Sequence, residues 1–364
     1  MVSREALSRL HEYVPGERRP GVLKLSSNEN PLGSAPSAVA AIQSLATTVS
    51  IYPDGGATRL RAALAERHGV TQQQVITGNG SDEIMVMAAA AVVNPGDVAV
   101  TAEHTFSVYG FATNLFDGRV VSTPMTDGRH NVDHFLSAVA AEPSARVVFF
   151  CNPNNPTGTY VSESEILRLL DGVPPHVLVV LDEAYCEYMD APDAPDGARL
   201  VDRYPNLLVL RTFSKIYGLA GLRVGYGIAQ EPIISLLEKT RMPFNTNLVA
   251  QEAALAALDD EKFVERSLRI NRAGRERLFR EMDARGFGYY PTQANFLCIH
   301  VDQASKPFCE RVASNGVTIR PLTSFGLPDW IRVTIGTDEQ IDRFLIAFDA
   351  AASELPRRAH ATAG

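Results

Sequence analysis

Short apolar runs alternate with amphipathic segments along the first two thirds of the chain. The runs have the length and continuity of strands buried on both faces, and the amphipathic segments repeat their apolar residues with the period of a helix. This alternation predicts an α/β domain in which helices cover both faces of a mostly parallel sheet. The predicted strands are residues 74–77, 97–101, 119–122, 146–150, 177–181, 207–210 and 224–229, and the predicted helices are residues 37–45, 57–68, 84–93, 107–115, 133–141 and 162–170.

The pattern changes after residue 245. Long helical patterns are followed by shorter strand patterns and a closing helix, which indicates a second, smaller α+β lobe. The predicted helices are residues 248–258, 261–285 and 339–351, with strands near 295–300, 318–320 and 331–334, and the helix at 261–285 is expected to join the two lobes. The first residues are irregular and rich in proline and glycine, which predicts an arm. We therefore predict an N-terminal arm at 1–35, a large domain at 36–245 and a small C-terminal domain at 246–364.

The composition is that of an ordinary globular protein, with 364 residues of which 45% are hydrophobic and 21% charged. The net charge of −8 argues against a nucleic-acid partner, because the chain has no basic excess to neutralise a phosphate backbone. No apolar stretch reaches the roughly 18 residues that span a bilayer, and none has the form of a signal peptide. We expect no membrane partner and a cytoplasmic location.

The cysteines and histidines do not predict a metal site. The four cysteines have no metal-ligand spacing and are too sparse for a disulfide scaffold. The eight histidines show no ligand spacing either, so metal-assisted hydrolysis is disfavoured. A Ser-His-Asp hydrolase is also disfavoured, because no Gly-x-Ser-x-Gly motif is present.

Polar residues collect where predicted strands end. The turn at residues 78–82 feeds a helix, the amide-rich segment 151–158 follows a strand, and Asp182 ends a buried strand with Tyr185 close behind it. Lys215 follows another strand, in a stretch rich in hydroxyls and glycines. The carboxyl ends of parallel strands meet at one edge of a sheet, where α/β proteins bind ligands. These groups are therefore expected to lie together.

An amine, a carboxylate, an amide, a tyrosine and a helix N-terminus form the set that pyridoxal 5′-phosphate (PLP) requires. The amine can bond to the aldehyde, the carboxylate can keep the pyridine nitrogen protonated, and free backbone N–H groups can hold the phosphate. Taken singly, these signals are weaker. A loop lysine is usually only solvated, and the turn at 78–82 could be a simple turn capped by Ser81 or Asp82. A nucleotide-binding oxidoreductase is disfavoured because the turn lacks the third spaced glycine.

Several motifs resemble those of a known family. Asn155-Pro-Thr-Gly158, Asp182-Glu-Ala-Tyr185 and Ser214-Lys215 followed by Arg223 resemble the fold-type I aminotransferases. Four further segments resemble the histidinol-phosphate aminotransferase branch of this family. They are Asn28-Glu-Asn-Pro31, Tyr52-Pro53, Gly80-Ser-Asp-Glu83 and the ending from Phe325 to Thr337. The resemblance runs from about Tyr13 to the last helix. It implies a PLP-dependent homodimer whose arm packs on the small domain and on the partner subunit.

The resemblance also implies roles for individual residues. Lys215 would hold PLP and move the proton of the substrate, and Asp182 would pair with the pyridine nitrogen. Asn155 and Tyr185 would hydrogen-bond the 3-oxygen of the ring. The other cofactor contacts implied are Ser81, Asp82, Thr212, Ser214 and Arg223 at the phosphate, Tyr52 reaching in from the partner subunit, and Phe106 stacked on the ring where the family often has tyrosine.

Substrate recognition is assigned to Tyr13, Asn30, Arg320 and Arg332. Arginine suits this task because its planar fork binds carboxylate and phosphate alike. Arg332 would bind the phosphate arm of histidinol phosphate or the carboxylate of an amino acid, and Arg320 would add positive charge. From the residues alone, an exposed charge at a strand end is also a plausible interpretation of Arg332.

The predicted function is transfer of an amino group between histidinol phosphate and 2-oxoglutarate, a step of histidine biosynthesis. The nearest alternative is an aromatic amino acid aminotransferase acting on phenylalanine or tyrosine. A threonine-phosphate decarboxylase fits the ending at 325–337 less well. A non-catalytic module, such as the aminotransferase-like half of a transcription regulator, would need a basic DNA-binding segment that this sequence lacks.

Overall fold

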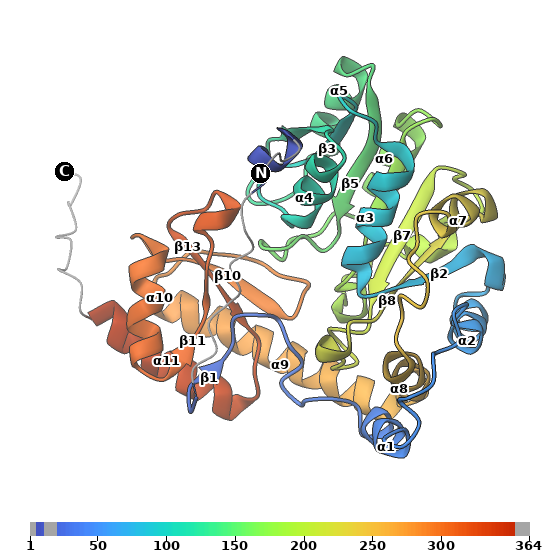
Figure 1. Ribbon diagram of the computed structural model, residues 1–364. Helices are drawn as coiled ribbons and strands as arrows, with labels where there is room; N and C mark the ends of the chain where they lie inside the picture. Colours follow the sequence, from blue (N-terminus) through green and yellow to red (C-terminus); the bar gives the residue numbers. More distant parts are fainter. Residues whose placement is uncertain (1–4, 11–19, 354–364) are drawn as a thin grey trace.

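A computed structural model describes residues 5–10 and 20–353 and places them in two lobes (Figure 1). The large lobe is built on a seven-stranded sheet with the order β2-β8-β7-β6-β5-β3-β4. Only β8 runs antiparallel to its neighbours in this sheet. The strands are β2 (Val75–Gly78), β3 (Val98–Ala102), β4 (Arg119–Thr123), β5 (Ala145–Cys151), β6 (Leu178–Asp182), β7 (Leu207–Thr212) and β8 (Gly225–Ala229). The predicted mostly parallel α/β fold is confirmed.

The central strands are apolar on both faces, as a parallel sheet covered by helices requires. On β5, Val148 and Phe150 point into one core, whereas Val147 and Phe149 point into the other. The helices divide between the two faces. One face is covered by α1 (Pro36–Ser44), α2 (Thr58–His68), α5 (Val132–Ala141), α6 (Glu163–Gly172) and α8 (Leu248–Leu258), and the other by α3 (Ser81–Val92), α4 (Val108–Leu115) and α7 (Glu231–Glu238).

The small lobe has a separate core under an antiparallel sheet with the order β12-β13-β10-β9. The helix α9 runs along the base of both lobes (Figure 1), and its Phe263 lies in the large-lobe core whereas Leu278 and Met282 lie in the small-lobe core. The remaining elements are α9 (Glu261–Arg285), β9 (Tyr289–Tyr290), β10 (Phe296–His300), α10 (Ser305–Ser314), β11 (Val317–Thr318), β12 (Arg320–Pro321), β13 (Trp330–Thr334) and α11 (Asp338–Ser353).

Local signals fix several element ends. The side chain of Asp260 accepts a hydrogen bond from the Phe263 N–H at the start of α9, and Gly286 ends the helix at φ 72°. Ser162 and Glu165 form a capping box at the start of α6. The sequence predicted α8 and α9 with the bounds that the structure shows.

The arm joins the small lobe. Its strand β1 (Leu23–Lys24) pairs in parallel with β11, and Leu25 is buried in the small-lobe core. The Leu25 carbonyl also accepts from the Thr334 N–H at 2.8 Å. This covers the end of β13 with residues from the far end of the chain.

Some predicted elements differ from the structure. The helix α8 packs against α1 in the large-lobe core, although the boundary predicted at 245/246 assigned it to the small domain. The strand predicted at 318–320 is two strands, because Thr318 pairs with the arm in β11 while Arg320 pairs with Arg332 in β12. The sequence pattern does not predict α7 or α10, and it predicts the start of α3 at residue 84, whereas the helix begins at Ser81. We keep the three-part division as a proposal, with α8 packed on the large domain.

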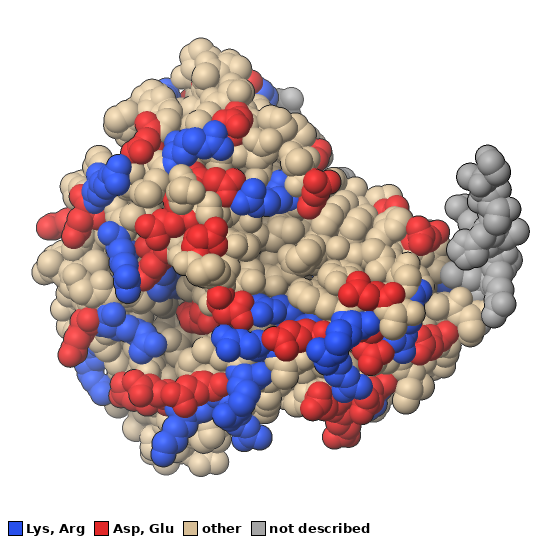
Figure 2. Space-filling model, turned by 180° about the vertical axis from the view of Figure 1, so that it is seen from behind, with Lys and Arg blue, Asp and Glu red and all other residues tan. Residues whose placement is uncertain are grey.

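Charges of both signs are interspersed over the face of the molecule shown in Figure 2. Within residues 5–10 and 20–353, no helix is both long and apolar enough to cross a membrane.

Gly218 and Gly69 offer a matched test of close packing between the arm and the large lobe. Both have positive φ, 69° and 67°, but a Cβ on Gly218 would lie 2.0 Å from the Gly33 carbonyl oxygen, whereas one on Gly69 meets nothing within 4 Å. We expect Gly69→Ala to lower the free energy of unfolding by about 1 kcal/mol from backbone strain alone. Gly218→Ala should cost a further 1–3 kcal/mol or so, because a backbone atom must move. Urea unfolding of both variants measures the difference, and equal losses would contradict the close approach.

Candidate active site

A cavity of about 290 Å³ lies at the carboxyl ends of the parallel strands, between the lobes. It collects side chains from the large lobe, the small lobe and the arm. The predicted site residues that line it are Ser81, Asp82, Phe106, Asn155, Asp182, Tyr185, Thr212, Ser214, Lys215, Arg223, Arg320 and Arg332. The sequence-predicted clusters therefore meet in one place.

Lys215 lies in the loop between β7 and β8. Its Nζ is 3.5 Å from the Ser27 carbonyl oxygen and 5.5 Å from the centre of the Tyr185 ring. Burial lowers the pKa of the amine to about 8, and the positive charge of Arg332 acts in the same direction. A lysine with a depressed pKa supplies neutral amine near physiological pH, which a nucleophile or a base requires.

Asp182 ends β6 and is 2% exposed. The Tyr109 hydroxyl donates to its Oδ2 at 2.6 Å, and the Ala184 N–H donates to Oδ1 at 3.1 Å. Burial raises the pKa of Asp182 to about 6 despite these two bonds. No ion pair joins Asp182 to a cation among the described residues, although a buried carboxylate is costly without one. A protonated pyridine nitrogen would supply that positive charge, so the site fits PLP on this point.

Tyr109 contacts the candidate site through Asp182, although the sequence does not predict it as a site residue. It lies on α4, is 1% exposed and stacks on Phe149 with the ring centres 5.0 Å apart. Phe106, which lines the cavity just before α4, contacts the Tyr109 ring edge-on with the ring centres 5.8 Å apart. A tyrosine in an apolar helix is usually interpreted as a core residue. Only the hydrogen bond from its hydroxyl to Asp182 shows that Tyr109 supports the candidate site.

Asn155 and Tyr185 line the cavity from the segments that follow β5 and β6. Arg332 of β13 donates through Nη1 to the Asn155 Oδ1 and through Nη2 to the Ser26 carbonyl at 3.0 Å. Arg332 is 6% exposed, so it is a buried cavity residue and not the exposed strand-end charge that the sequence also allowed. Burial lowers the pKa of its guanidinium to about 10.

The opposite end of the cavity has the features of an anion site. The helix α3 begins at Ser81, and its first N–H groups have no partner within the helix. Arg223 donates to the Ser214 hydroxyl at 3.2 Å and to Asp82 at 3.2 Å. A Cβ on Gly225 would lie 2.4 Å from the Ser81 nitrogen, so only glycine permits β8 to lie this close to the helix end. A helix N-terminus beside an arginine and hydroxyls fits a phosphate.

Among the described residues, two predicted site residues are not brought into this cavity. Tyr52 is 78% exposed, stacks on Phe244 at 4.6 Å and lines a separate groove. The Asn30 amide donates to the Ile216 carbonyl at 2.8 Å and to the Ser267 hydroxyl at 3.0 Å, so Asn30 holds the arm and does not line the cavity as predicted. Tyr13 lies outside the described residues.

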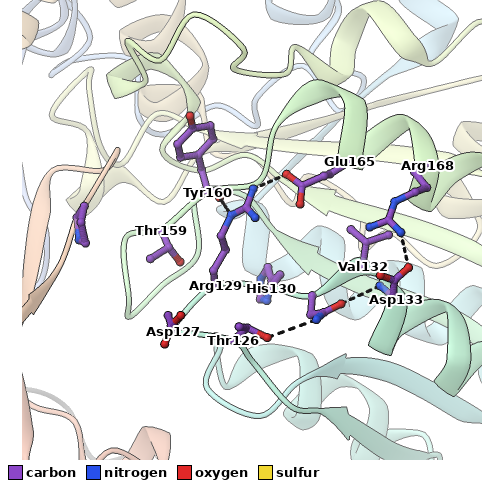
Figure 3. A pocket seen from close by; sticks show the side chains of 12 residues that line it. Thr126, Asp127, Arg129, His130, Val132, Asp133, Thr159, Tyr160, Glu165 and Arg168 are labelled. Carbon is purple, nitrogen blue, oxygen red and sulfur yellow. Dashed lines mark hydrogen bonds and ion pairs between the residues drawn. The ribbon is translucent and has the colours of Figure 1, made fainter.

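A larger cavity, of about 490 Å³, lies apart from these groups beside α5 and α6 (Figure 3). Its two arginines are already neutralised, because Arg129 pairs with Glu165 and Arg168 pairs with Asp133. The first pair joins the loop before α5 to α6, and the second joins the first turn of α5 to α6. The residues that line this cavity include no lysine and none of the predicted site residues gathered around Lys215.

The depressed pKa of Lys215 can be measured in the cofactor-free protein. Only the neutral amine reacts with an amine-directed acylating reagent, so labelling of Lys215 should rise with pH along a curve with its midpoint near 8. Arg332→Ala should move the midpoint upward, because a repelling positive charge is removed. Peptide mass spectrometry across a pH series measures both curves. A midpoint near 10.5, the ordinary value for lysine, would contradict the described environment.

The comparisons with known proteins agree with this geometry. The family model for class I and II aminotransferases matches residues 20–348. The chain is 45% identical to a histidinol-phosphate aminotransferase from Moorella thermoacetica, over 94% of this chain and 91% of that protein. It is 48% identical to one from Akkermansia muciniphila, over 87% and 86% respectively.

A solved structure is also similar. The histidinol-phosphate aminotransferase from Sinorhizobium meliloti, in complex with pyridoxal-5′-phosphate, matches with a TM-score of 0.91 and 28% identity, over 97% of this chain and 98% of that chain. These matches span nearly the whole chain and confirm the resemblance seen in its motifs. The chain belongs to the class I and II aminotransferase family.

Proposed function

We propose that the protein is a PLP-dependent aminotransferase that exchanges the amino group between histidinol phosphate and 2-oxoglutarate, as a step of histidine biosynthesis. The observation that carries the proposal is the meeting of Lys215 and Asp182 with two arginines, Arg320 and Arg332, in one cavity. The relatives named histidinol-phosphate aminotransferase support this substrate over the aromatic amino acids. We also propose that the enzyme acts in the cytoplasm.

When bound, PLP supplies an aldehyde and a ring that accepts electrons from the bonds of the substrate α-carbon. Lys215 would hold the cofactor and later act as the base that moves the α-proton. With a pKa of about 8, roughly a tenth of the free amine is neutral at pH 7, so the amine can both take up and return a proton. Asp182 would keep the ring nitrogen protonated.

The other large-lobe residues would orient the ring. Asn155 and Tyr185 would hydrogen-bond its 3-oxygen, and Phe106 would cover one face. The phosphate would be held by the α3 N-terminus with Ser81, Thr212, Ser214 and Arg223. These assignments are supported by the family match, by the fold and by the position of the residues around the cavity.

The two arginines would select the substrate. Arg320 and Arg332 are register partners on β12 and β13. Arg332 is already bonded to Asn155 and Ser26, whereas no ion pair joins Arg320 to a carboxylate within residues 5–10 and 20–353. Arg332 would bind the carboxylate of glutamate or the phosphate of histidinol phosphate, and Arg320 would supply the additional charge that a phosphate favours.

The substrate assignment is tested by comparing kcat/KM for histidinol phosphate with that for phenylalanine, with 2-oxoglutarate as acceptor. We expect histidinol phosphate to be preferred by at least tenfold or so, and Lys215→Ala to abolish turnover with both donors. Arg320→Ala should reduce kcat/KM for histidinol phosphate more than for phenylalanine, because only the former carries a phosphate. A preference for phenylalanine would instead favour an aromatic aminotransferase, which the aromatic Phe106 and Phe325 in the cavity wall would suit.

We further propose a homodimer in which Tyr52 completes the phosphate site of the partner subunit. Ile51, Tyr52 and Met242 are 68%, 78% and 68% exposed, and Phe244 is 43% exposed beside Tyr52. Such large apolar side chains together on a surface favour burial against another protein surface. A second copy of the chain would cover them and bring a phenol hydroxyl to the anion site.

A complementation experiment tests the role of Tyr52. Tyr52→Phe should weaken PLP affinity about fivefold to tenfold by removing one hydrogen bond to an anion. Mixed with Lys215→Ala subunits, it should regain wild-type PLP affinity, because the hybrid dimer has one site with an intact Lys215 and an intact Tyr52 from the other chain. The measurement is the PLP concentration that half-restores activity. No recovery in the mixture, or an active monomer by light scattering, would contradict the dimeric site.

A further inference from the structure

The arm segment Ser26–Glu29 crosses the cavity and contacts three of its functional groups. The Ser26 carbonyl accepts from Arg332, and the Ser27 carbonyl lies 3.5 Å from the Lys215 amine. The Asn28 Nδ2 donates to the Tyr185 hydroxyl at 3.0 Å. The proposed mechanism assigns no function to Asn28, yet its side chain is the arm's contact with Tyr185.

The position of Asn28 is fixed from several directions. It is 1% exposed and has φ 57°, a left-handed conformation that asparagine adopts more readily than most residues. Its N–H donates to the Thr334 hydroxyl at 2.9 Å, and its carbonyl accepts from the Asn295 Nδ2 at 2.9 Å. Both of these partners belong to the small lobe, so the small lobe holds the amide of Asn28 against the phenol.

This contact determines where the phenol hydrogen can point. A phenol has one hydrogen to donate, and its oxygen also accepts. In the hydrogen bond between the two side chains, the Asn28 amide is the donor and the Tyr185 hydroxyl oxygen is the acceptor. The hydroxyl hydrogen of Tyr185 therefore stays available for a second hydrogen bond. The remaining direction is toward the cavity, where a ring oxygen would accept it. The titratable and charged groups around Tyr185 are Arg332, Asp182, Cys151, Lys215 and Tyr188. Within the described part of the chain, none of them makes a hydrogen bond to the phenol that would compete for its hydrogen.

We propose that Asn28 is a positioning residue that directs the Tyr185 hydroxyl hydrogen toward the 3-oxygen of the bound cofactor. The proposal rests on the proposed function, because that oxygen belongs to PLP. It adds a residue of the arm to the groups that tune the cofactor. It also makes the hydrogen bond of Tyr185 depend on how the arm is held by Thr334 and Asn295.

The test uses the holoenzyme and the visible absorbance of its bound cofactor as a function of pH. A donor to the ring oxygen lowers the basicity of that oxygen, so losing the donor should raise the pH midpoint of the absorbance change. We expect Asn28→Gly, which retains the positive φ, to raise the midpoint by on the order of half a unit. Tyr185→Phe should raise it by about one unit.

Two controls separate positioning from a general structural effect. In the Tyr185→Phe background, Asn28→Gly should cause no further shift, because the group through which Asn28 acts is gone. Asn30→Gly makes the same substitution in the same arm, at a buried amide that does not line the cavity, and it should leave the midpoint unchanged.

Three outcomes would overturn the proposal. The first is an unshifted midpoint in Asn28→Gly, and the second is an equal shift with or without the Tyr185 hydroxyl. The third is a shift in Asn30→Gly as large as that in Asn28→Gly, which would assign the effect to the arm as a whole. A wild-type protein with no visible cofactor band would instead refute the proposed function, and this proposal with it.

Discussion

A carboxylate at the end of a fully buried strand is the constraint around which this molecule is arranged. Asp182 is held by the Tyr109 hydroxyl and the Ala184 N–H, neither of which carries a charge. Hydrogen bonds from neutral donors offset only part of the cost of burying an anion, and the raised pKa of Asp182 reflects that. The same carboxylate beside a cationic ring nitrogen would be stabilised. The large lobe thus places a carboxylate that is unfavourable alone where, in the proposed function, a bound cofactor would make it favourable.

In the proposed mechanism, the two lobes would separate the reaction chemistry from substrate selection. The large lobe supplies Lys215, Asp182 and the anion site, whereas the small lobe supplies Arg320 and Arg332. The arm connects the two lobes, because Leu25 is hydrogen-bonded to the small lobe and Asn28 is hydrogen-bonded to Tyr185 of the large lobe. A shift of the small lobe therefore changes the arginines and the arm together.

Much of this arrangement could be predicted from the sequence, and the reasons for success and failure are physical. Strand ends mark where polar side chains converge, so Lys215, Asp182, Asn155 and the turn at 78–82 were found from local patterns. Asn28 and Asn30 belong to the same motif, and only Asn30 is predicted as a site residue, because nothing local distinguishes two asparagines whose partners are far away in the chain. Tyr109 and the packing of α8 on α1 were missed for the same reason, because apolar periodicity shows that a face is buried but not against what.

The antiparallel direction of β8 has a consequence for how the chain can vary. Thr212 pairs with Gly225, so the loop that carries Ser214, Lys215 and Arg223 leaves the sheet and returns to it at adjacent positions. Both ends of this loop are fixed. Its first end, Thr212 of β7, pairs with β8, and its second end, Gly225 of β8, also packs closely against the start of α3. Because neither end of the loop can shift, an inserted residue would change the path of the loop and move the Lys215 amine relative to the Asp182 carboxylate. Length, as much as residue identity, is therefore constrained in this loop, whereas the exposed turn at Gly69 can change without moving any reacting group.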